Sequence, residues 1–301
     1  MGNMLDAPRE GDWGVKLEPA YVDLVAGKFN TVRLPVRWSN HAAPTADATI
    51  DEAFAKRVDA AVDAFLAKGM VVILDVHHYT QITGDKQHPN EFAVEPGVLD
   101  QRLLNLWKQV AARYKDRSPK LLFELFNEPH GRLSGEAWNS LATRTLAVVR
   151  ATNPNRTVLV GPDEWNGIPS LKKLRLPLDR NIIVSIHNYD PMAFTHQGVE
   201  WMPQYHVGTP CCDDAQRRQI VDALDAAQRW NAMTGYPVYL GEFGAYEKAD
   251  MKSRAEYTRI VREEADKRGI GWAYWEFASS FGIYSPKTGS WVEPLRSALL
   301  D

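Results

Sequence analysis

Leu121-Leu122-Phe123-Glu124-Leu125-Phe126 is a short apolar run that ends directly in Asn127-Glu128-Pro129-His130. Similar runs recur along the chain, and each ends in polar or aromatic residues before a longer segment of helical period. The predicted strands are Thr31–Val36, Val71–Val76, Leu121–Phe126, Thr157–Gly161, Ile182–Ile186, Val238–Leu240 and Gly271–Trp275. Short strands that alternate with helices are typical of a parallel sheet built from βα units. The sequence therefore predicts an α/β fold.

Apolar residues between the predicted strands repeat at three- and four-residue spacing, for example over 54–65 and 99–114. This spacing predicts helices that pack one face on the sheet. The length of 301 residues allows two domains of about 150 residues or one barrel. Because no linker, repeat or low-complexity tract divides the chain, we expect a single catalytic domain over residues 1–301, a (β/α)8 TIM barrel.

The composition excludes several classes of partner. The 35 Lys and Arg residues against 38 Asp and Glu leave a net charge of −3, without the basic excess that a nucleic-acid binder needs. Apolar runs such as Met70–Leu74 fall far short of the about 20 residues that span a bilayer, so we expect no membrane partner.

Cys211 and Cys212 are neighbours and form no C-x-x-C motif, which predicts an incidental loop pair.

Two carboxylates follow predicted apolar strands, at the edge where a parallel barrel carries its active site. Glu128 and Glu242 stand at these positions, and a carboxylate there is paired, solvated or functional because burial of its charge is costly. Counted on the fourth and seventh strands of an eight-stranded barrel, they would face each other across its mouth. Two carboxylates about 5 Å apart suit double displacement at a glycosidic bond.

His77 and His78 raise the alternative of a metal-dependent hydrolase. Adjacent strand residues point to opposite faces, so at most one of the two would join a site with His187. The sequence has no H-E-x-x-H motif and no H-x-H at a strand end, so we expect no metal and no cofactor. Trp275 ends another strand beside Glu276, where an indole forms a floor under a sugar ring or packs the barrel end.

Several consecutive motifs carry a resemblance over nearly the whole chain. They are 32–38, 75–79, 127–129, 194–198 with Trp201, 240–246 and 272–277. The sequence resembles glycoside hydrolase family 5, the cellulase branch of the retaining (β/α)8 glycosidases. The resemblance implies that Glu128 is the general acid/base and Glu242 the nucleophile.

The resemblance also implies roles for residues around the two glutamates. Asn127 would bond the sugar 2-hydroxyl, and Arg33 and Tyr189 would hold Glu242 ionised. His187 would support Glu128. The residues expected to bind substrate are Asn3, Asp6, His77, His78, Trp165, His196, Trp201, Trp275 and Glu276.

The chain departs from the family pattern in two places. His187-Asn188-Tyr189 stands where the family often has His-Tyr-Tyr, and Met1 directly precedes Gly2-Asn3 where the family has an N-terminal strand. We therefore expect the first strand of the barrel to be truncated or missing.

The function implied by the resemblance is a retaining endo-β-1,4-glucanase that cleaves internal bonds of a β-glucan or related plant polysaccharide. We expect a monomer, and an extracellular location follows from the substrate class, although no signal peptide is visible. A β-mannanase, a bifunctional glucanase/mannanase and a catalytically impaired carbohydrate-binding barrel are the alternatives.

Overall fold

The computed structural model describes residues 1–87 and 91–301, which divide into two compact units. The larger unit comprises Asn3–Asn166 and Lys172–Val184. The smaller unit comprises Met1–Gly2, Gly167–Leu171 and Ser185–Asp301. The chain therefore passes between the two units several times.

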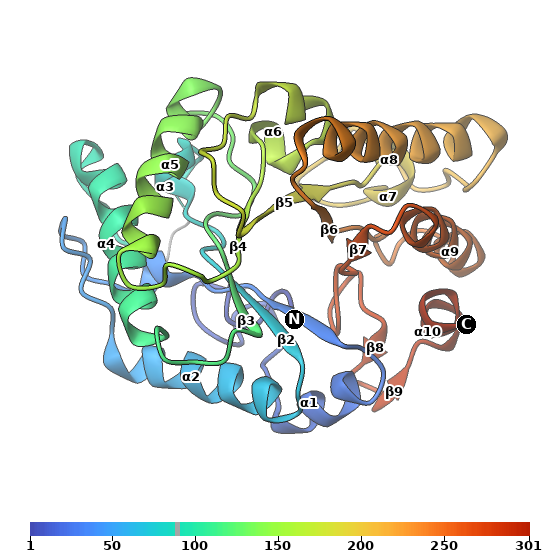
Figure 1. The fold of residues 1–301 in the computed structure, drawn as a ribbon. Coiled ribbons are helices and arrows are strands. Elements are labelled where there is room, and N and C mark those ends of the chain that lie inside the picture. The colour runs from blue at the N-terminus through green and yellow to red at the C-terminus, as the bar shows by residue number, and fades with distance from the viewer. Residues whose placement is uncertain (88–90) are drawn as a thin grey trace. The chain divides into compact units, whose positions relative to one another are not determined.

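The strands β1 to β7 follow one another in the sheet in chain order, and their helices lie between them along the chain (Figure 1). In the larger unit the strands are β1 (Thr31–Leu34), β2 (Val71–Asp75), β3 (Leu121–Glu124), β4 (Val158–Val160) and the first half of β5 (Ile182–His187). All of these pairs are parallel, as in βα units. The register places Asp75 of β2 beside Glu124 of β3.

The smaller unit contains the end of β5, then β6 (Val238–Glu242) and β7 (Gly271–Trp272), which pair in parallel. A hairpin of β8 (Tyr284–Ser285) and β9 (Ser290–Trp291) follows. Each of the seven predicted strands is present, and Thr31–Leu34 is the first strand of the sheet within residues 1–87 and 91–301. Five of them are shorter than predicted, and the positions they lose are mostly apolar ones such as Val76 and Phe126, whereas β5 and β6 extend beyond the prediction to His187 and Glu242.

Helices cover the two segments predicted at 54–65 and 99–114 and several further segments of the chain. In the larger unit they are α1 (Pro19–Ala26), α2 (Glu52–Ala67), α3 (Thr80–Thr83), α4 (Leu99–Arg113), α5 (Glu136–Arg150) and α6 (Asp163–Asn166), with 3-10 turns η1 (Trp38–His41) and η2 (Pro96–Val98). The turn η3 (Ile168–Lys173) has residues in both units. In the smaller unit they are α7 (Met192–Thr195), α8 (Asp214–Thr234), α9 (Met251–Lys267) and α10 (Glu293–Leu300).

Sequence signals explain where the longer helices begin and which side they bury. The Asp51 carboxylate accepts the backbone N–H of Phe54 (2.8 Å) and caps α2. Phe54, Val58 and Phe65 on this helix are buried, as the apolar spacing predicts. Within the described part of the chain, no helix has both the length and the apolar character of a membrane span.

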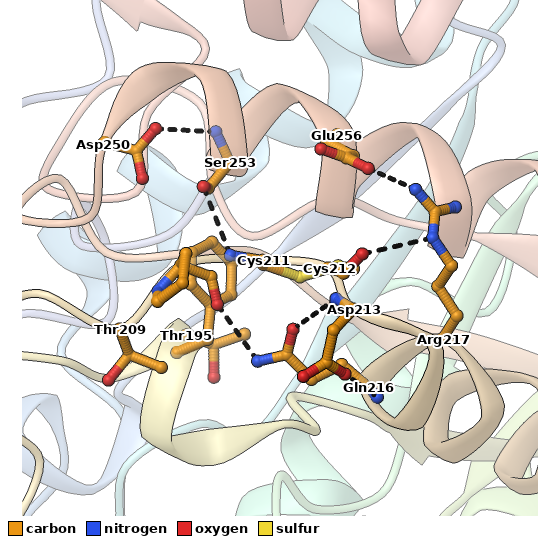
Figure 2. Close-up of a disulfide and its surroundings, with 12 residues drawn as sticks. Thr195, Thr209, Cys211, Cys212, Asp213, Gln216, Arg217, Asp250, Ser253 and Glu256 are labelled. Carbon is orange, nitrogen blue, oxygen red and sulfur yellow. Dashed lines mark hydrogen bonds and ion pairs between the residues drawn. A yellow bond between two sulfur atoms is a disulfide. The ribbon is translucent and has the colours of Figure 1, made fainter.

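Cys211 and Cys212 form a disulfide with each other just before α8 (Figure 2). The backbone N–H of Cys211 donates to Ser253 Oγ of α9 (3.2 Å), and the carbonyl of Cys212 accepts from Arg217 Nε of α8 (3.3 Å). The sequence predicts an incidental pair, whereas in the structure the disulfide segment contacts two helices. Local sequence could not show this, because both partners lie outside the cysteine loop.

Candidate active site

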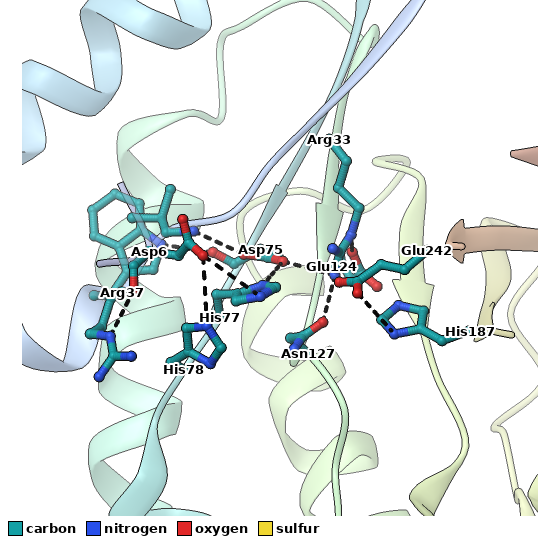
Figure 3. Close-up of polar contacts among 12 residues, drawn as sticks. Asp6, Arg33, Arg37, Asp75, His77, His78, Glu124, Asn127, His187 and Glu242 are labelled. Carbon is teal, nitrogen blue, oxygen red and sulfur yellow. Dashed lines mark hydrogen bonds and ion pairs between the residues drawn. The ribbon is translucent and has the colours of Figure 1, made fainter. Parts of the chain in front are cut away.

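A buried network of charges in the larger unit begins at Arg33 of β1 (Figure 3). Its guanidinium pairs with Glu124 Oε2 at 2.6 Å and with Asp75 Oδ2 at 2.9 Å, and it donates to Asn127 Oδ1 at 2.8 Å. Because Asp75 and Glu124 lie side by side in the sheet, the arginine offsets two carboxylates that would otherwise repel each other. The contact of Arg33 with Glu242, expected from the sequence, stays a prediction.

Asn127 and Glu128 follow β3 in the loop where the strand ends. The backbone N–H of Asn127 donates to Val76 O (3.0 Å), which holds the start of this loop against β2. Glu128 is half-buried, and its backbone has a φ of 53°, a left-handed conformation that strains a non-glycine residue by about 1–3 kcal/mol. Strain of this kind clusters at functional sites, so it marks Glu128 independently of its chemistry.

The environment of Glu128 favours its protonated form. Burial is the largest effect and raises the pKa of Glu128 to about 7, although the nearby Arg33 and His130 oppose this rise. His130 Nδ1 donates to the backbone carbonyl of Glu128 (2.6 Å), and its Nε2 lies 2.8 Å from Asp85 Oδ2. A carboxylic acid with a pKa near 7 is suited to donate a proton at neutral pH.

Asp6, His77 and His78 come together in the same unit. His77 Nδ1 lies 2.8 Å from Asp75 Oδ2, and the ring Nε2 atoms of His77 and His78 lie 4.0 and 3.6 Å from Asp6 Oδ2. Burial raises the pKa of Asp6 to about 7. Strand alternation predicts that the two histidines point to opposite faces. Both approach Asp6 instead, because β2 ends at Asp75, before either histidine.

Glu242 ends β6 in the smaller unit, where it lies beside two of the predicted residues. Tyr189 Oη donates to Glu242 Oε2 at 2.8 Å, and His187 Nδ1 lies 3.7 Å from the same oxygen. Gly241 leaves room for the histidine, because a Cβ there would lie 3.0 Å from His187 Nε2 and 2.7 Å from Ser185 Oγ. A hydroxyl that donates to a carboxylate stabilises the ionised form.

His196 and Glu276 are buried in the smaller unit. Burial lowers the pKa of His196 to about 4, and its ring contacts Tyr189 edge-on with centroids 4.9 Å apart. Glu276 accepts hydrogen bonds from the backbone N–H (2.8 Å) and the hydroxyl (2.6 Å) of Ser279. These bonds stabilise the loop that contains both residues. Burial raises the pKa of Glu276 despite these hydrogen bonds. The expected contact of either residue with substrate stays a prediction.

The three predicted tryptophan platforms differ in exposure. Trp201 is 64% exposed and meets Tyr246 edge-on, whereas Trp275 is half-buried against the backbone of Gly2. In the larger unit Trp165 is 52% exposed and stacks on His130 with ring centroids 4.6 Å apart. Asn3 has a left-handed backbone with a φ of 64°.

Sequence reasoning missed several residues that hold this site. Asp75 and Glu124 anchor Arg33, and His130 links Glu128 to Trp165. Glu124 was detectable, because a lone charge inside an apolar strand needs a partner. His130 carried no local signal of its contacts beyond its place beside the Asn-Glu-Pro motif.

Glu128, whose pKa burial raises to about 7, follows one parallel strand, and Glu242, which accepts a tyrosine hydroxyl, ends another. Carboxyl groups in such contrasting surroundings are typical of glycoside hydrolases. The family model described as Cellulase (glycosyl hydrolase family 5) matches residues 7–280. The chain belongs to this family.

Solved structures similar to this chain cover it almost completely. Cel5A of Thermotoga maritima, determined in complex with cellobiose, is 40% identical with a TM-score of 0.93, and the match covers 99% of this chain and 95% of that chain. Cel5A in complex with mannotriose matches with 39% identity, a TM-score of 0.93 and the same coverage. These similarities and the strand order confirm the predicted (β/α)8 fold class.

Among curated relatives, Endoglucanase H of Acetivibrio thermocellus is 33% identical over 309 residues. That match covers 100% of this chain but 32% of the relative, so the chain spans about a third of the relative's length. Cellulase/esterase CelE of the same organism is 31% identical, over 98% of this chain and 38% of that protein.

Proposed function

We propose that this chain is an endo-β-1,4-glucanase that hydrolyses internal bonds of a β-glucan with retention of configuration. The observation that carries the proposal is the contrast between Glu128, whose pKa is raised to about 7 by burial, and Glu242, which accepts the Tyr189 hydroxyl. Two carboxyl groups whose surroundings differ in this way suit the acid and the nucleophile of a retaining glycosidase. Both units together would form one catalytic domain, acting as a monomer.

In the first step Glu242 attacks the anomeric carbon of the sugar. Glu128 donates its proton to the departing glycosidic oxygen, so that the bond breaks and the leaving chain is released as a neutral alcohol. The sugar is then joined to Glu242 through an ester bond. In the second step Glu128 takes a proton from water, the oxygen of which attacks the same carbon and releases Glu242, giving a product of β configuration.

Asn127 is suited to bind the sugar 2-hydroxyl. Arg33 has only N–H donors, so the carboxamide oxygen of Asn127 faces the arginine and its NH2 group remains to donate to the sugar. A hydrogen bond to this hydroxyl strengthens as the transition state forms. Tyr189 positions Glu242 for attack through its 2.8 Å hydrogen bond.

The substrate class follows from the relatives. They are named as an endoglucanase and a cellulase/esterase, and the structure of Cel5A was determined in complex with cellobiose. We therefore propose a β-1,4-glucan as the polymer, with the exposed Trp201 and Trp165 as stacking platforms. The mannanase and binding-protein alternatives are not favoured, because both glutamates are present and the matched family is named for cellulases.

A reducing-sugar assay with carboxymethylcellulose, barley β-glucan, glucomannan and mannan tests the proposal. We expect the highest rate on a β-1,4-glucan, and loss of hydrolysis in Glu242→Gln with sugar binding retained. Glu247→Gln, at an exposed glutamate of the same unit, is the matched control and should keep wild-type activity. Unchanged hydrolysis by Glu242→Gln would overturn the proposal.

A further inference from the structure

We propose that Asp6, His77 and His78 form a binding site for a divalent transition-metal ion such as Cu²⁺ or Zn²⁺. Each residue offers one ligand atom, and the three atoms lie within 4.8 Å of one another. All three belong to the larger unit, and Figure 3 shows both imidazoles turned toward the Asp6 carboxylate. The proposal concerns ion binding, which differs from the expectation of no metal drawn from the sequence and is separate from the proposed catalytic roles.

The two carboxylate oxygens of Asp6 differ in their hydrogen bonding. Oδ1 accepts the backbone N–H of Met4 (2.9 Å), and Arg37 Nε fixes the Asp6 backbone by donating to its carbonyl (2.8 Å). Oδ2 is buried, and no hydrogen-bond donor reaches it from residues 1–87 or 91–301. A buried carboxylate oxygen without a donor needs a partner, and a cation supplies one.

His77 is held in the form that a metal requires. Its Nδ1 donates to Asp75 Oδ2 (2.8 Å), so in the neutral ring Nε2 carries the lone pair and faces Asp6. Asp75 is itself fixed by Arg33 (2.9 Å) and by the backbone N–H of Val36 (3.0 Å). A carboxylate behind a histidine is the outer shell that orients metal-binding imidazoles.

His78 supplies the second nitrogen and the access to solvent. Its Nε2 lies 3.6 Å from Asp6 Oδ2, and its ring meets His77 edge-on with centroids 4.4 Å apart. Ligand atoms of a tetrahedral zinc ion lie about 3.4 Å from one another, from bond lengths near 2.0–2.1 Å. The observed separations of 3.6 and 4.0 Å therefore need only small side-chain movements.

The donor set selects the ion. Two imidazole nitrogens and one carboxylate favour copper, zinc, nickel or cobalt over Mg²⁺ and Ca²⁺, which prefer all-oxygen sites, and Cu²⁺ should bind most tightly. Because Asp6, His77 and His78 are also the residues expected to bind sugar, a bound ion would exclude the glucan and inhibit the enzyme. The expected inhibition rests on the proposed function, whereas ion binding itself does not.

Calorimetry and Cu²⁺ electron paramagnetic resonance on the untagged, chelator-treated full chain, without sugar, test the site. We expect one tight Cu²⁺ ion per chain with hyperfine splitting from two nitrogens, displacement by Zn²⁺, and no competition from Mg²⁺ or Ca²⁺. His78→Gln, at a half-exposed position, should weaken binding at least about tenfold, and Asp6→Asn should do the same.

His206→Gln is the matched control, because His206 is exposed and lies outside the cluster. Equal Cu²⁺ affinity in wild type and His78→Gln, or a loss of binding in His206→Gln alone, would overturn the site. Competition is measured in Glu242→Gln with cellotriose, which should weaken Cu²⁺ binding. If saturating cellotriose left Cu²⁺ binding unchanged, the proposed inhibition would be overturned. The ion site itself would then be judged by the comparison of wild type with His78→Gln.

Discussion

Glu128 and Glu242 owe their different proposed roles to their neighbours rather than to their own chemistry. Glu128 lies in a strained loop, where burial favours the neutral acid. Glu242 ends a strand and accepts a tyrosine hydroxyl, which favours the carboxylate. Two side chains of the same type are thereby suited to different roles in one reaction.

The raised pKa of Glu128 predicts the pH at which activity is lost. Only the protonated acid assists departure of the leaving group, so kcat/KM for a cellooligosaccharide should fall as pH rises through about 7. The measurement is the pH profile of wild type and of Glu128→Gln. The variant should be slower by about 10²–10⁴-fold and should lack this alkaline limb.

An activated aryl cellobioside provides the control for this prediction. Its leaving group needs no proton, so its first-step rate should survive in Glu128→Gln. An alkaline limb that persists in this variant, or a wild-type limb near the ordinary carboxyl pKa of 4.5, would show that Glu128 is not the acid.

The sequence predicts Glu128 and Glu242 as site residues and the contact of Tyr189 with Glu242, which the structure contains, but it does not predict the contacts around Glu128. Apolar runs locate strand ends, and strand ends locate polar side chains. The left-handed backbone of Glu128 had no counterpart in the sequence, because glutamate rarely adopts it. The partner of His130 lies 45 residues away at Asp85, a distance that local patterns do not bridge.

Strands β1, β2 and β3 are joined by side chains as well as by backbone hydrogen bonds. Arg33, Asp75 and Glu124 each come from a different strand, and all three are buried. Removing one member leaves buried charge unpaired. This network therefore links the stability of the sheet to the orientation of Asn127, which the same arginine contacts.

Arg33→Met should destabilise the chain by about 3–5 kcal/mol, because it leaves Asp75 and Glu124 buried side by side without a cation. Urea unfolding followed by circular dichroism measures the loss. Arg296→Met removes an exposed ion pair with Glu293 and should cost at most about 1 kcal/mol. Similar small losses in both variants would contradict the role given to Arg33.

Replacement of both cysteines by serine, Cys211→Ser with Cys212→Ser, should change stability by only about 1 kcal/mol. The disulfide closes a loop of adjacent residues, so it constrains the unfolded chain little. The contacts to Ser253 and Arg217 use backbone atoms of the pair and survive the change. Thermal unfolding with and without dithiothreitol measures the effect, and a loss of several kcal/mol would refute this prediction.

Element positions were more predictable than their ends. Apolar runs predicted all seven strands and apolar periods the long helices, but β7 has two residues where the sequence predicts five. The backbone N–H groups of Ala273 and Trp275 still donate to Leu240 and Phe243, so the pairing continues beyond the regular strand. The hairpin of β8 and β9 is two residues long on each side and lacks a pattern that distinguishes it from a loop. Register across strands, such as Asp75 beside Glu124, needs the folded sheet.

The chain as a whole should unfold in a single transition. It passes between the two compact units four times, after Gly2, Asn166, Leu171 and Val184, and β5 has residues in both. A unit made of separate chain segments has little to hold it once the other unfolds, so we expect one cooperative domain. Differential scanning calorimetry measures this, and two resolved transitions would contradict the single domain predicted over residues 1–301.

The most direct test of the central claim is covalent trapping with a 2-deoxy-2-fluoro-β-cellobioside that carries an activated leaving group. The fluorine slows the second step, so a glucan-cleaving enzyme that forms an ester on Glu242 should accumulate one label per chain. Peptide mass spectrometry should then place the label on Glu242, and Glu242→Gln should remain unlabelled. Hydrolysis of β-glucan without any trapped ester, or a label on another residue, would contradict the account.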